Sequence, residues 1–188
     1  MVKIRDNLVE RKNREIRSSQ RFSLLAVVVI CVLAFIFYLS NFVLIKIYVS
    51  GPSMENTLYN GDIVLANTSY GKLKTGDVVI IEKPGEDYLI IKRVIAVDKC
   101  TVEIIDGNVY VDGEKLVEPY VDGAYTRPYY PQKTKWELKD GEVFYLGDNR
   151  SVSADSRQNG PCDKSMILGK VFDFSLNRDG VLFAYFNR

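Results

Sequence analysis

The longest hydrophobic pattern in the chain is an uncharged run of 23 residues, Phe22–Leu44, rich in Val, Leu, Ile and Phe. As a helix it would reach about 35 Å, which is enough to cross a bilayer with some tilt. A buried core helix that is apolar on every side would need a larger protein around it. A cleavable signal peptide fits poorly, because its apolar region spans only about 7 to 15 residues before a small-x-small site. The pattern therefore predicts a transmembrane helix over residues 22–44.

Beyond this run, short apolar segments bounded by turn residues indicate β structure. A hairpin is predicted where Thr101–Ile105 is followed by Asp106-Gly107-Asn108 and then by Val109–Val111. The segment Val117–Lys139 carries prolines and tyrosines without a clear period, which predicts an irregular excursion over the sheet. The other predicted strands are Asp62–Ala66, Asp77–Glu82, Tyr88–Val97, Val143–Leu146, Gly169–Phe174 and Val181–Phe186. The fold class is thus expected to be mainly β with one N-terminal helix.

Charge adds an orientation to this picture. Residues 1–21 hold seven Lys and Arg against three acidic residues, whereas the remainder holds 18 against 21. By the positive-inside rule, this excess predicts a cytoplasmic basic segment over residues 1–21 and an extracytoplasmic domain over residues 45–188. No cluster of Lys and Arg elsewhere resembles a nucleic-acid footprint. The expected partner is therefore a lipid bilayer and not a nucleic acid.

The cysteines leave one question open. Cys100 and Cys162 lie in the predicted outer domain, where a disulfide could persist, but two cysteines alone do not establish a bond. Cys31 lies within the apolar run, where it is a small apolar residue. Two lone cysteines without histidine fall short of the usual zinc ligand set, so we expect no metal and no cofactor.

The chain contains no histidine, which leaves Ser-Lys as the pair that could activate a hydroxyl. Ser53 follows Gly51-Pro52, where a turn would expose its hydroxyl and leave its backbone N–H available to an oxyanion. Lys92 lies in an apolar strand, where burial would lower its pKa and yield the neutral amine that a general base requires. A polar linker at Ser53 and a lysine with its ammonium in water are the ordinary alternatives.

Two further patterns surround this pair. Strand alternation places Lys92 on one face with Ile90 and Val94, and leaves Arg93 on the other face for a carboxylate or solvent. The segment Gly147–Arg157 packs charged and hydroxyl residues into a loop after a strand. Taken alone, such a loop is a hydrogen-bonded turn with a local ion pair.

Together these segments resemble the type I signal peptidases, membrane-bound Ser-Lys proteases that remove signal peptides from exported proteins. The likeness runs from the apolar run almost to the end of the chain. The matching segments are Ser50–Leu58, Gly61–Val64, Gly76–Val79, Ile91–Ile95 and Gly147–Arg157, with further similarity in Ile104–Val111 and Leu176–Arg178. The resemblance implies a signal-peptidase-like antiparallel β catalytic domain behind one transmembrane anchor.

The resemblance also implies residue roles. Ser53 would attack the scissile carbonyl and form an acyl-enzyme, its backbone N–H would stabilise the oxyanion, and neutral Lys92 would carry the proton to the leaving amine. Ser153 would orient the lysine by hydrogen bonding. A supporting ion-pair network would consist of Asp155, Arg157 and Arg93. Signal peptides of exported precursors would bind extended against an exposed strand, with small side chains at the first and third positions before the cut.

Two positions depart from the family pattern. Asn56 stands where proline is usual, which predicts a looser turn after the nucleophile. Gly51 stands where some members carry a serine hydroxyl in the oxyanion hole, so a second donor is not assigned. The short region between Lys92 and Gly147 leaves no room for a large accessory domain, which predicts a more open site.

Three alternatives differ in class from this hypothesis. A membrane-anchored β binding module would need neither Ser53 nor Lys92, and a catalytically silent homologue would bind signal peptides without cutting them. The presence of both residues speaks against the silent homologue. A self-cleaving Ser-Lys repressor would carry a DNA-binding domain in place of the apolar run. The sequence leaves oligomeric state and self-cleavage open.

Overall fold

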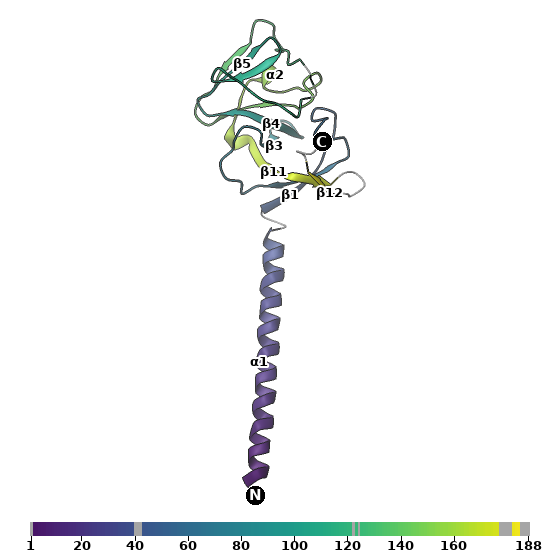
Figure 1. The fold of residues 1–188 in the computed structure, drawn as a ribbon, viewed down its shortest axis with the longest axis vertical. Helices are drawn as coiled ribbons and strands as arrows, with labels where there is room; N and C mark the ends of the chain where they lie inside the picture. The colour runs from purple at the N-terminus through teal and green to yellow at the C-terminus, as the bar shows by residue number, and fades with distance from the viewer. Residues whose placement is uncertain (1, 40–42, 122, 124, 177–181, 185–188) are drawn as a thin grey trace. The chain divides into compact units, whose positions relative to one another are not determined.

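A computed structural model describes residues 2–39, 43–121, 123, 125–176 and 182–184. The chain divides into two compact units, Met1–Val43 and Leu44–Arg188. Figure 1 shows the single helix of the first unit and the strands of the second.

The first unit consists of one helix, α1, which runs from Val2 to Tyr38. Within it, Gln20–Tyr38 forms a 19-residue stretch that is long and apolar enough to cross a membrane. This stretch is about 28 Å long, close to the hydrocarbon thickness of a bilayer. The apolar side chains along it are exposed, as expected for a surface that meets lipid.

The predicted span over residues 22–44 shares residues 22–38 with α1, and residues 40–42 lie outside the described residues. The helix α1 ends at Tyr38, and Leu44 already begins strand β1 (Leu44–Tyr48). In this strand the charged Lys46 separates Ile45 from Ile47, so the local pattern alternates with the period of a strand.

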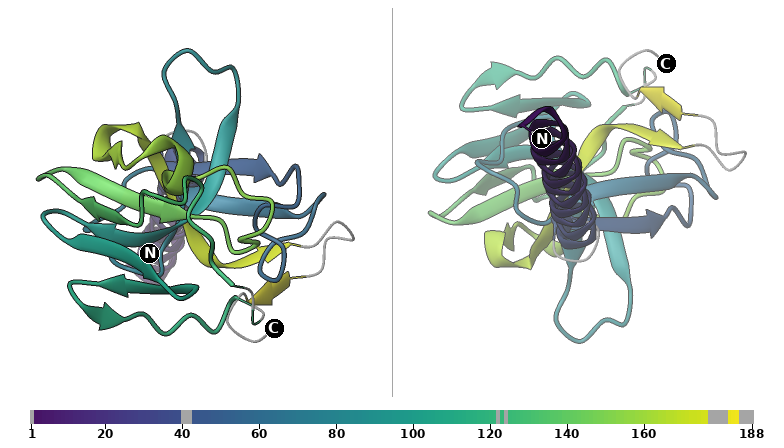
Figure 2. Two further views of the ribbon diagram at one scale, coloured as in Figure 1. Left: turned by 90° about the horizontal axis from the view of Figure 1, so that it is seen from above. Right: turned by 90° about the horizontal axis from the view of Figure 1, so that it is seen from below.

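The second unit contains two antiparallel sheets, seen from two directions in Figure 2. The strands of the larger sheet, besides β1, are β2 (Ile63–Asn67), β3 (Val78–Glu82), β4 (Leu89–Val97), β9 (Glu142–Leu146), β10 (Cys162–Asp163), β11 (Ile167–Leu176) and β12 (Leu182–Ala184). Their order is β1-β2-β11-β3-β4-β9-β10, with β12 paired to β11. The fold class predicted from the sequence, mainly antiparallel β with one N-terminal apolar helix, is confirmed.

The smaller sheet includes the predicted hairpin, whose two strands pair as expected. It contains β5 (Thr101–Ile105), β6 (Asn108–Val111), β7 (Glu114–Lys115) and β8 (Lys135–Glu137) in the order β7-β6-β5-β8. Two short helices complete the unit, α2 (Ser156–Asn159) and the 3-10 helix η2 (Lys164–Met166).

The central strand β3 is buried on both faces, which explains its unbroken apolar pattern. Ile80 packs in one core with Met54 and Leu58. Val79 packs in a second core with Val94. The first core thus holds the turn that carries Ser53, and the second core holds strand β4.

The predicted excursion Val117–Lys139 is wrong at one point, because Lys135–Glu137 forms strand β8 and pairs with β5. The reason is Trp136, which is buried and packs with its ring centroid 5.0 Å from that of Phe144. Strands β1, β7 and β10 and helix α2 were also not predicted. Of the predicted strand Val181–Phe186, residues 182–184 form β12, and the rest lies outside the described residues.

The two cysteines of this unit are free thiols. Cys162 is buried in the core that contains Val79, whereas Cys100 packs against the core that contains Trp136. The structure therefore places them in different cores, without a disulfide between them.

Strand β4 is paired on both edges over only part of its length. Leu89–Arg93 pair with β3, but pairing with β9 begins at Arg93 and continues to Val97. Among the described strands, none pairs with the second edge of residues 89–92. Figure 2 shows the loop between β3 and β4 projecting away from the other strands.

Candidate active site

Ser53 and Lys92, 39 positions apart, are in direct contact. Ser53 lies in the turn after β1, and Lys92 lies in β4. The ammonium or amine nitrogen Nζ of Lys92 lies 2.7 Å from Ser53 Oγ. It also donates to the backbone oxygen of Ile91 at 2.9 Å. The two residues predicted as a nucleophile and its base are thus within hydrogen-bond distance.

The turn that carries Ser53 is held from both sides. The neighbouring Met54 is 1% exposed and anchors the turn in the core. Backbone bonds close the turn, from Glu55 N to Pro52 O at 3.1 Å and from Leu58 N to Met54 O at 2.8 Å. Because the turn is fixed on either side of Ser53, its hydroxyl is presented toward Lys92 in one position.

Lys92 is buried, with 4% of its surface exposed. Burial lowers its pKa to about 8, because desolvation disfavours the charged ammonium; Asp155 and Asp148 oppose this shift, and Lys83 adds to it. An ordinary lysine is almost wholly charged at neutral pH, but here roughly a tenth of the molecules would hold the neutral amine at pH 7. The site thus provides a base that can accept a hydroxyl proton.

The backbone around Ser53 offers one oxyanion donor. The N–H of Ser53 donates to no acceptor among the described residues, so it is available to a developing oxyanion. The N–H of Gly51 donates to Asn60 Oδ1 at 3.1 Å. Gly51 therefore provides neither a side-chain hydroxyl nor a free backbone N–H as a second oxyanion donor.

Asn56 adopts a backbone angle φ of 83°. This left-handed region is closed to proline, whose ring fixes φ near −65°, but it is tolerated by asparagine. The turn is not loose at this point, since Thr57 N donates to Met54 O at 3.0 Å. Asn56 in place of proline therefore goes with a backbone conformation that proline could not adopt, and the turn keeps its hydrogen bond.

Replacing Asn56 by proline should destabilise the second unit by at least about 1 kcal/mol and impair the site, because the ring is incompatible with the observed φ. The matched control is Asn56→Gly, which accepts this backbone and should stay close to wild type. Thermal unfolding checks both variants. A proline variant as stable as wild type would contradict the turn described here.

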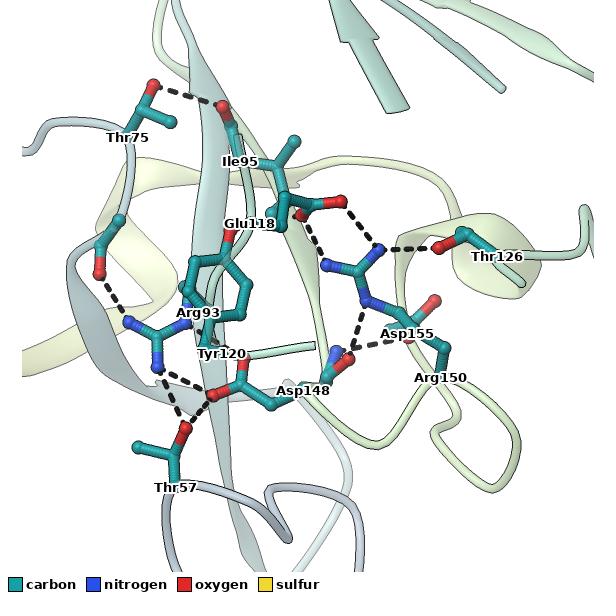
Figure 3. Close-up of polar contacts among 12 residues, drawn as sticks. Thr57, Thr75, Arg93, Ile95, Glu118, Tyr120, Thr126, Asp148, Arg150 and Asp155 are labelled. Atoms are coloured by element: carbon teal, nitrogen blue, oxygen red, sulfur yellow. Dashed lines mark hydrogen bonds and ion pairs between the residues drawn. The ribbon is translucent and has the colours of Figure 1, made fainter. Parts of the chain in front are cut away.

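Arg93 is buried and forms a two-pronged ion pair with Asp148, as Figure 3 shows. Its Nε donates to Asp148 Oδ1 at 2.8 Å, and its second terminal nitrogen donates to Oδ2 at 2.6 Å. The Thr57 hydroxyl donates to the same carboxylate, and the Tyr120 ring lies over the guanidinium with its centroid 4.0 Å away. This cluster joins β4, the loop after β9 and the turn that follows Ser53.

Asp155 and Arg157 form a separate pair within the loop at the start of α2. Arg157 Nε donates to Asp155 Oδ1 at 2.8 Å, and the same carboxylate accepts the backbone N–H of Gly147 at 3.2 Å. The predicted single network of Asp155, Arg157 and Arg93 therefore needs correction. Arg93 pairs with Asp148, because β4 presents it toward the loop directly after β9.

Ser153 lies beside this pair, with its backbone oxygen accepting from Arg157 at 3.1 Å. Its hydroxyl is buried and has no hydrogen-bond partner among the described residues, which include Lys92. A Cβ atom on Gly147 would clash with both Ser153 Oγ and the backbone oxygen of Ser53. Gly147 therefore allows the Ser153 loop and the Ser53 turn to approach one another.

Several residues of the site were not predicted. Asp148 and Arg150 belong to the segment Gly147–Arg157, so a signal for them existed. Glu118 pairs with Arg150 from within the irregular excursion, and no sequence pattern indicated it. Figure 3 shows Arg150 held between Glu118 and Thr126. The described residues contain no group of three or more His, Cys, Asp or Glu side chains that could hold a metal ion.

A cleft of about 310 Å³ opens beside Ser53 and Lys92. One wall is the end of β1 and the following turn, including Ile47 and Val49, and the other is the unpaired part of β4 with Leu89 and Ile91. The cleft therefore combines apolar side chains with the free edge of a strand, next to a hydroxyl and a buried amine. This arrangement suits acyl transfer from an extended peptide.

The chain is similar to several known proteins that are named signal peptidase I. The chain is 31% identical over 176 residues to "Signal peptidase I" of Bacillus licheniformis, covering 86% of this chain and 91% of that protein. It is 33% identical over 159 residues to "Signal peptidase I S" of Bacillus subtilis, covering 77% and 82%. A crystal structure of a signal peptidase I from Enterococcus faecalis is 25% identical, covering 55% of this chain and 100% of that chain, with a TM-score of 0.47.

The family comparison covers both the apolar helix and the sheet. Residues 20–175 match the family described as "Signal peptidase, peptidase S26". The match includes Ser53, Lys92 and the loop from Gly147 to Arg157. The chain therefore belongs to the signal peptidase family, peptidase S26.

Proposed function

We propose that this protein is a membrane-anchored serine endopeptidase that removes N-terminal signal peptides from exported precursor proteins at the outer membrane surface. The observation that carries the proposal is the 2.7 Å contact between Lys92 Nζ and Ser53 Oγ, with the lysine buried. Family membership supports signal peptides as the substrate class. The apolar stretch Gln20–Tyr38 supports a membrane anchor, and the basic residues before it support a cytoplasmic N-terminus.

In the proposed mechanism, Ser53 Oγ attacks the scissile carbonyl carbon while its proton passes to neutral Lys92. The backbone N–H of Ser53 stabilises the resulting oxyanion. Collapse of the tetrahedral species breaks the peptide bond, and the Lys92 ammonium returns the proton to the leaving amine. This leaves an ester between Ser53 and the signal peptide. A water molecule, deprotonated by the lysine, then hydrolyses the ester and releases the carboxylate.

A neutral amine has two N–H donors and one lone pair. When the lone pair accepts the Ser53 hydroxyl proton, one donor can remain on the Ile91 backbone oxygen, which Lys92 already contacts. We infer that Ser153 Oγ accepts the second N–H during the reaction, because its hydroxyl is buried and has no partner in the part of the chain that the structure describes. Arg157 would act by holding the Ser153 loop in place, and Asp155 would hold the same loop and also oppose the lowering of the Lys92 pKa through its charge.

The substrate would lie extended in the cleft and pair with the free edge of β4. The apolar walls around Ile47 and Leu89 would admit small side chains before the cut. The helix α1 would place the enzyme in the same bilayer as the apolar part of the signal peptide. Confining both partners to one membrane raises their effective concentration.

The rate should depend on pH through Lys92. Because only the neutral amine accepts the proton, kcat/KM should rise about tenfold per pH unit below the lysine pKa and level off above it. That pKa is about 8, so activity should increase from pH 6 and approach a plateau in the alkaline range. The measurement is kcat/KM of the full-length enzyme in detergent against a precursor at a series of pH values. A rate that stays constant between about pH 6 and 9 would rule out this base.

The proposal is tested by incubating a full-length secretory precursor with the enzyme in liposomes and sequencing the new N-terminus. Wild type should cut after a small-x-small site, and Ser53→Ala should lower the rate by at least about a thousandfold. Ser69→Ala is the matched control, since this serine is exposed and lies outside the lining of the cleft beside Ser53 and Lys92. Absence of cleavage by wild type would favour a silent homologue or an anchored binding module.

A further inference from the structure

A second cleft lies on the far side of the loop that carries Ser153. It has a volume of about 680 Å³ and is lined by residues between Tyr125 and Tyr129 on one wall and between Arg150 and Gln158 on the other. Its lining includes Ser153 but shares no residue with the cleft that contains Ser53 and Lys92. The proposed mechanism gives this space no role.

The walls of the second cleft are tied together by buried arginines. Arg150 donates to Thr126 Oγ1 at 2.7 Å and pairs with Glu118, as Figure 3 shows. Arg157 donates to the backbone oxygen of Arg127 at 3.1 Å. The excursion is therefore fixed against the Ser153 loop, and the space between them is part of the folded structure.

The second cleft carries an uncompensated positive charge. Its lining contains three arginines and no carboxylate side chain. Two of these arginines are neutralised, Arg150 by Glu118 and Arg157 by Asp155. The third, Arg127, is exposed and has no carboxylate partner among the described residues. Its guanidinium lies 5.9 Å from the ring centroid of Tyr125, so a cation stands beside exposed aromatic surface.

The Ser153 loop also contacts the Ser53 turn. Asn149 N donates to the backbone oxygen of Ser53 at 3.2 Å, and Gly147 separates that oxygen from Ser153 Oγ without room for a side chain. Ser153 also lines the second cleft. The two clefts therefore lie at either end of a path past Ser53 and Ser153 that an extended peptide would follow across its scissile bond under the proposed function.

We propose that the second cleft binds the first residues of the mature protein after the cleavage site, and that Arg127 favours an acidic side chain there. This inference rests on the proposed function and adds a preference for particular substrate residues after the scissile bond. The chemical basis is charge complementarity between a carboxylate of the substrate and the one unpaired guanidinium of the lining. Peptide backbone and apolar side chains would contact the tyrosines.

The test uses a precursor set with Glu, Gln or Lys placed in turn at each of the first four positions after the cut. Wild type should prefer Glu to Lys at one of these positions by about two- to fivefold in kcat/KM at low salt. Arg127→Ala should abolish this preference, and Arg127→Glu should reverse it, with the Glu and Lys rates of each variant expressed relative to its own rate on the Gln precursor. Lys72→Glu, a charge reversal at an exposed lysine outside this lining, should retain the wild-type preference.

The outcomes separate this inference from the proposed function. If wild type cuts the precursors and Arg127→Glu keeps the order Glu over Lys, the assignment of Arg127 is overturned while the peptidase activity stands. The assignment is also overturned if Lys72→Glu reverses the order, because the effect would then come from net charge. If wild type cuts none of the precursors, the proposed function falls, and this inference falls with it.

Discussion

A Lys92→Met variant should lose precursor cleavage and yet be more stable than wild type at pH 7. The loss of activity should be at least about a thousandfold, because the thioether of methionine is too weakly basic to take the hydroxyl proton. The gain in stability follows from the pKa of about 8. Holding a lysine that far below its ordinary pKa costs roughly 3 kcal/mol at neutral pH. Loss of the bond to the Ile91 oxygen offsets part of this, leaving a gain of about 1 to 2 kcal/mol.

The pH dependence of this gain has a definite sign. Between about pH 8 and 10.5 the unfolded chain binds more protons than the folded one, so wild type gains stability as pH rises through this window. The stability gap between wild type and Lys92→Met should therefore be constant below pH 8 and shrink toward pH 10.5. Thermal melts of the full-length proteins in detergent at several pH values measure it.

Ser53→Ala is the matched control for this result. It removes the nucleophile but leaves the lysine buried, so it should lose activity without the gain in stability. A Lys92→Met variant that melts below wild type at neutral pH would contradict the view that the charged lysine is held at a cost.

Asp148→Ala should destabilise the second unit by about 3 to 5 kcal/mol, because it leaves the buried guanidinium of Arg93 without its carboxylate. Both side chains of this pair are almost fully buried, with 2% and 0% of their surface exposed. The loop after β9 should also shift, since Asp148 immediately precedes Asn149, whose N–H donates to the Ser53 backbone oxygen. Cleavage should therefore fall together with the melting temperature.

A double-mutant cycle isolates the pair. Arg93→Met alone should also be strongly destabilising, whereas Arg93→Met with Asp148→Ala should cost less than the sum of the two, since neither charge is then left unpaired. Asp140→Ala is the control, because its contact with Lys99 is 3.5 Å long and about three-quarters exposed. That variant should change stability by no more than about 1 kcal/mol. Equal effects of Asp148→Ala and Asp140→Ala would refute a structural role for the buried pair.

The parts of the fold that the sequence predicted are those with a strong local period. The hairpin from Thr101 to Val111 has alternating residues and a turn signal between its strands, and both are local properties. Strand β1 was missed because its apolar residues directly follow the membrane-length run. Strand β8 was missed because three residues are too few to show a period. That Trp136 is a core residue follows only from its contact with Phe144, which the sequence does not show.

The candidate site divides in the same way. Ser53 and Lys92 were predictable because the absence of histidine restricts the chemistry and because each lies in a distinctive segment. The partner of Arg93 was not predictable, since Asp148 and Asp155 lie in the same segment. The alternation of side chains along β4 gives the face of Arg93 but does not distinguish between these two carboxylates. The pairing of Glu118 with Arg150 joins residues 32 positions apart, and no local pattern encodes such a contact.

The unpaired edge of β4 has a consequence for how many proteins one such enzyme can serve. A chain that pairs with residues 89–92 would be held by backbone N–H and C=O groups, which every amino acid except proline supplies in the same positions. Precursors with unrelated sequences could thus be bound equally well, provided that they are extended and free of proline over these few residues. A broad substrate range would then follow from recognition of the main chain, and side chains would be needed only to select the bond that is cut.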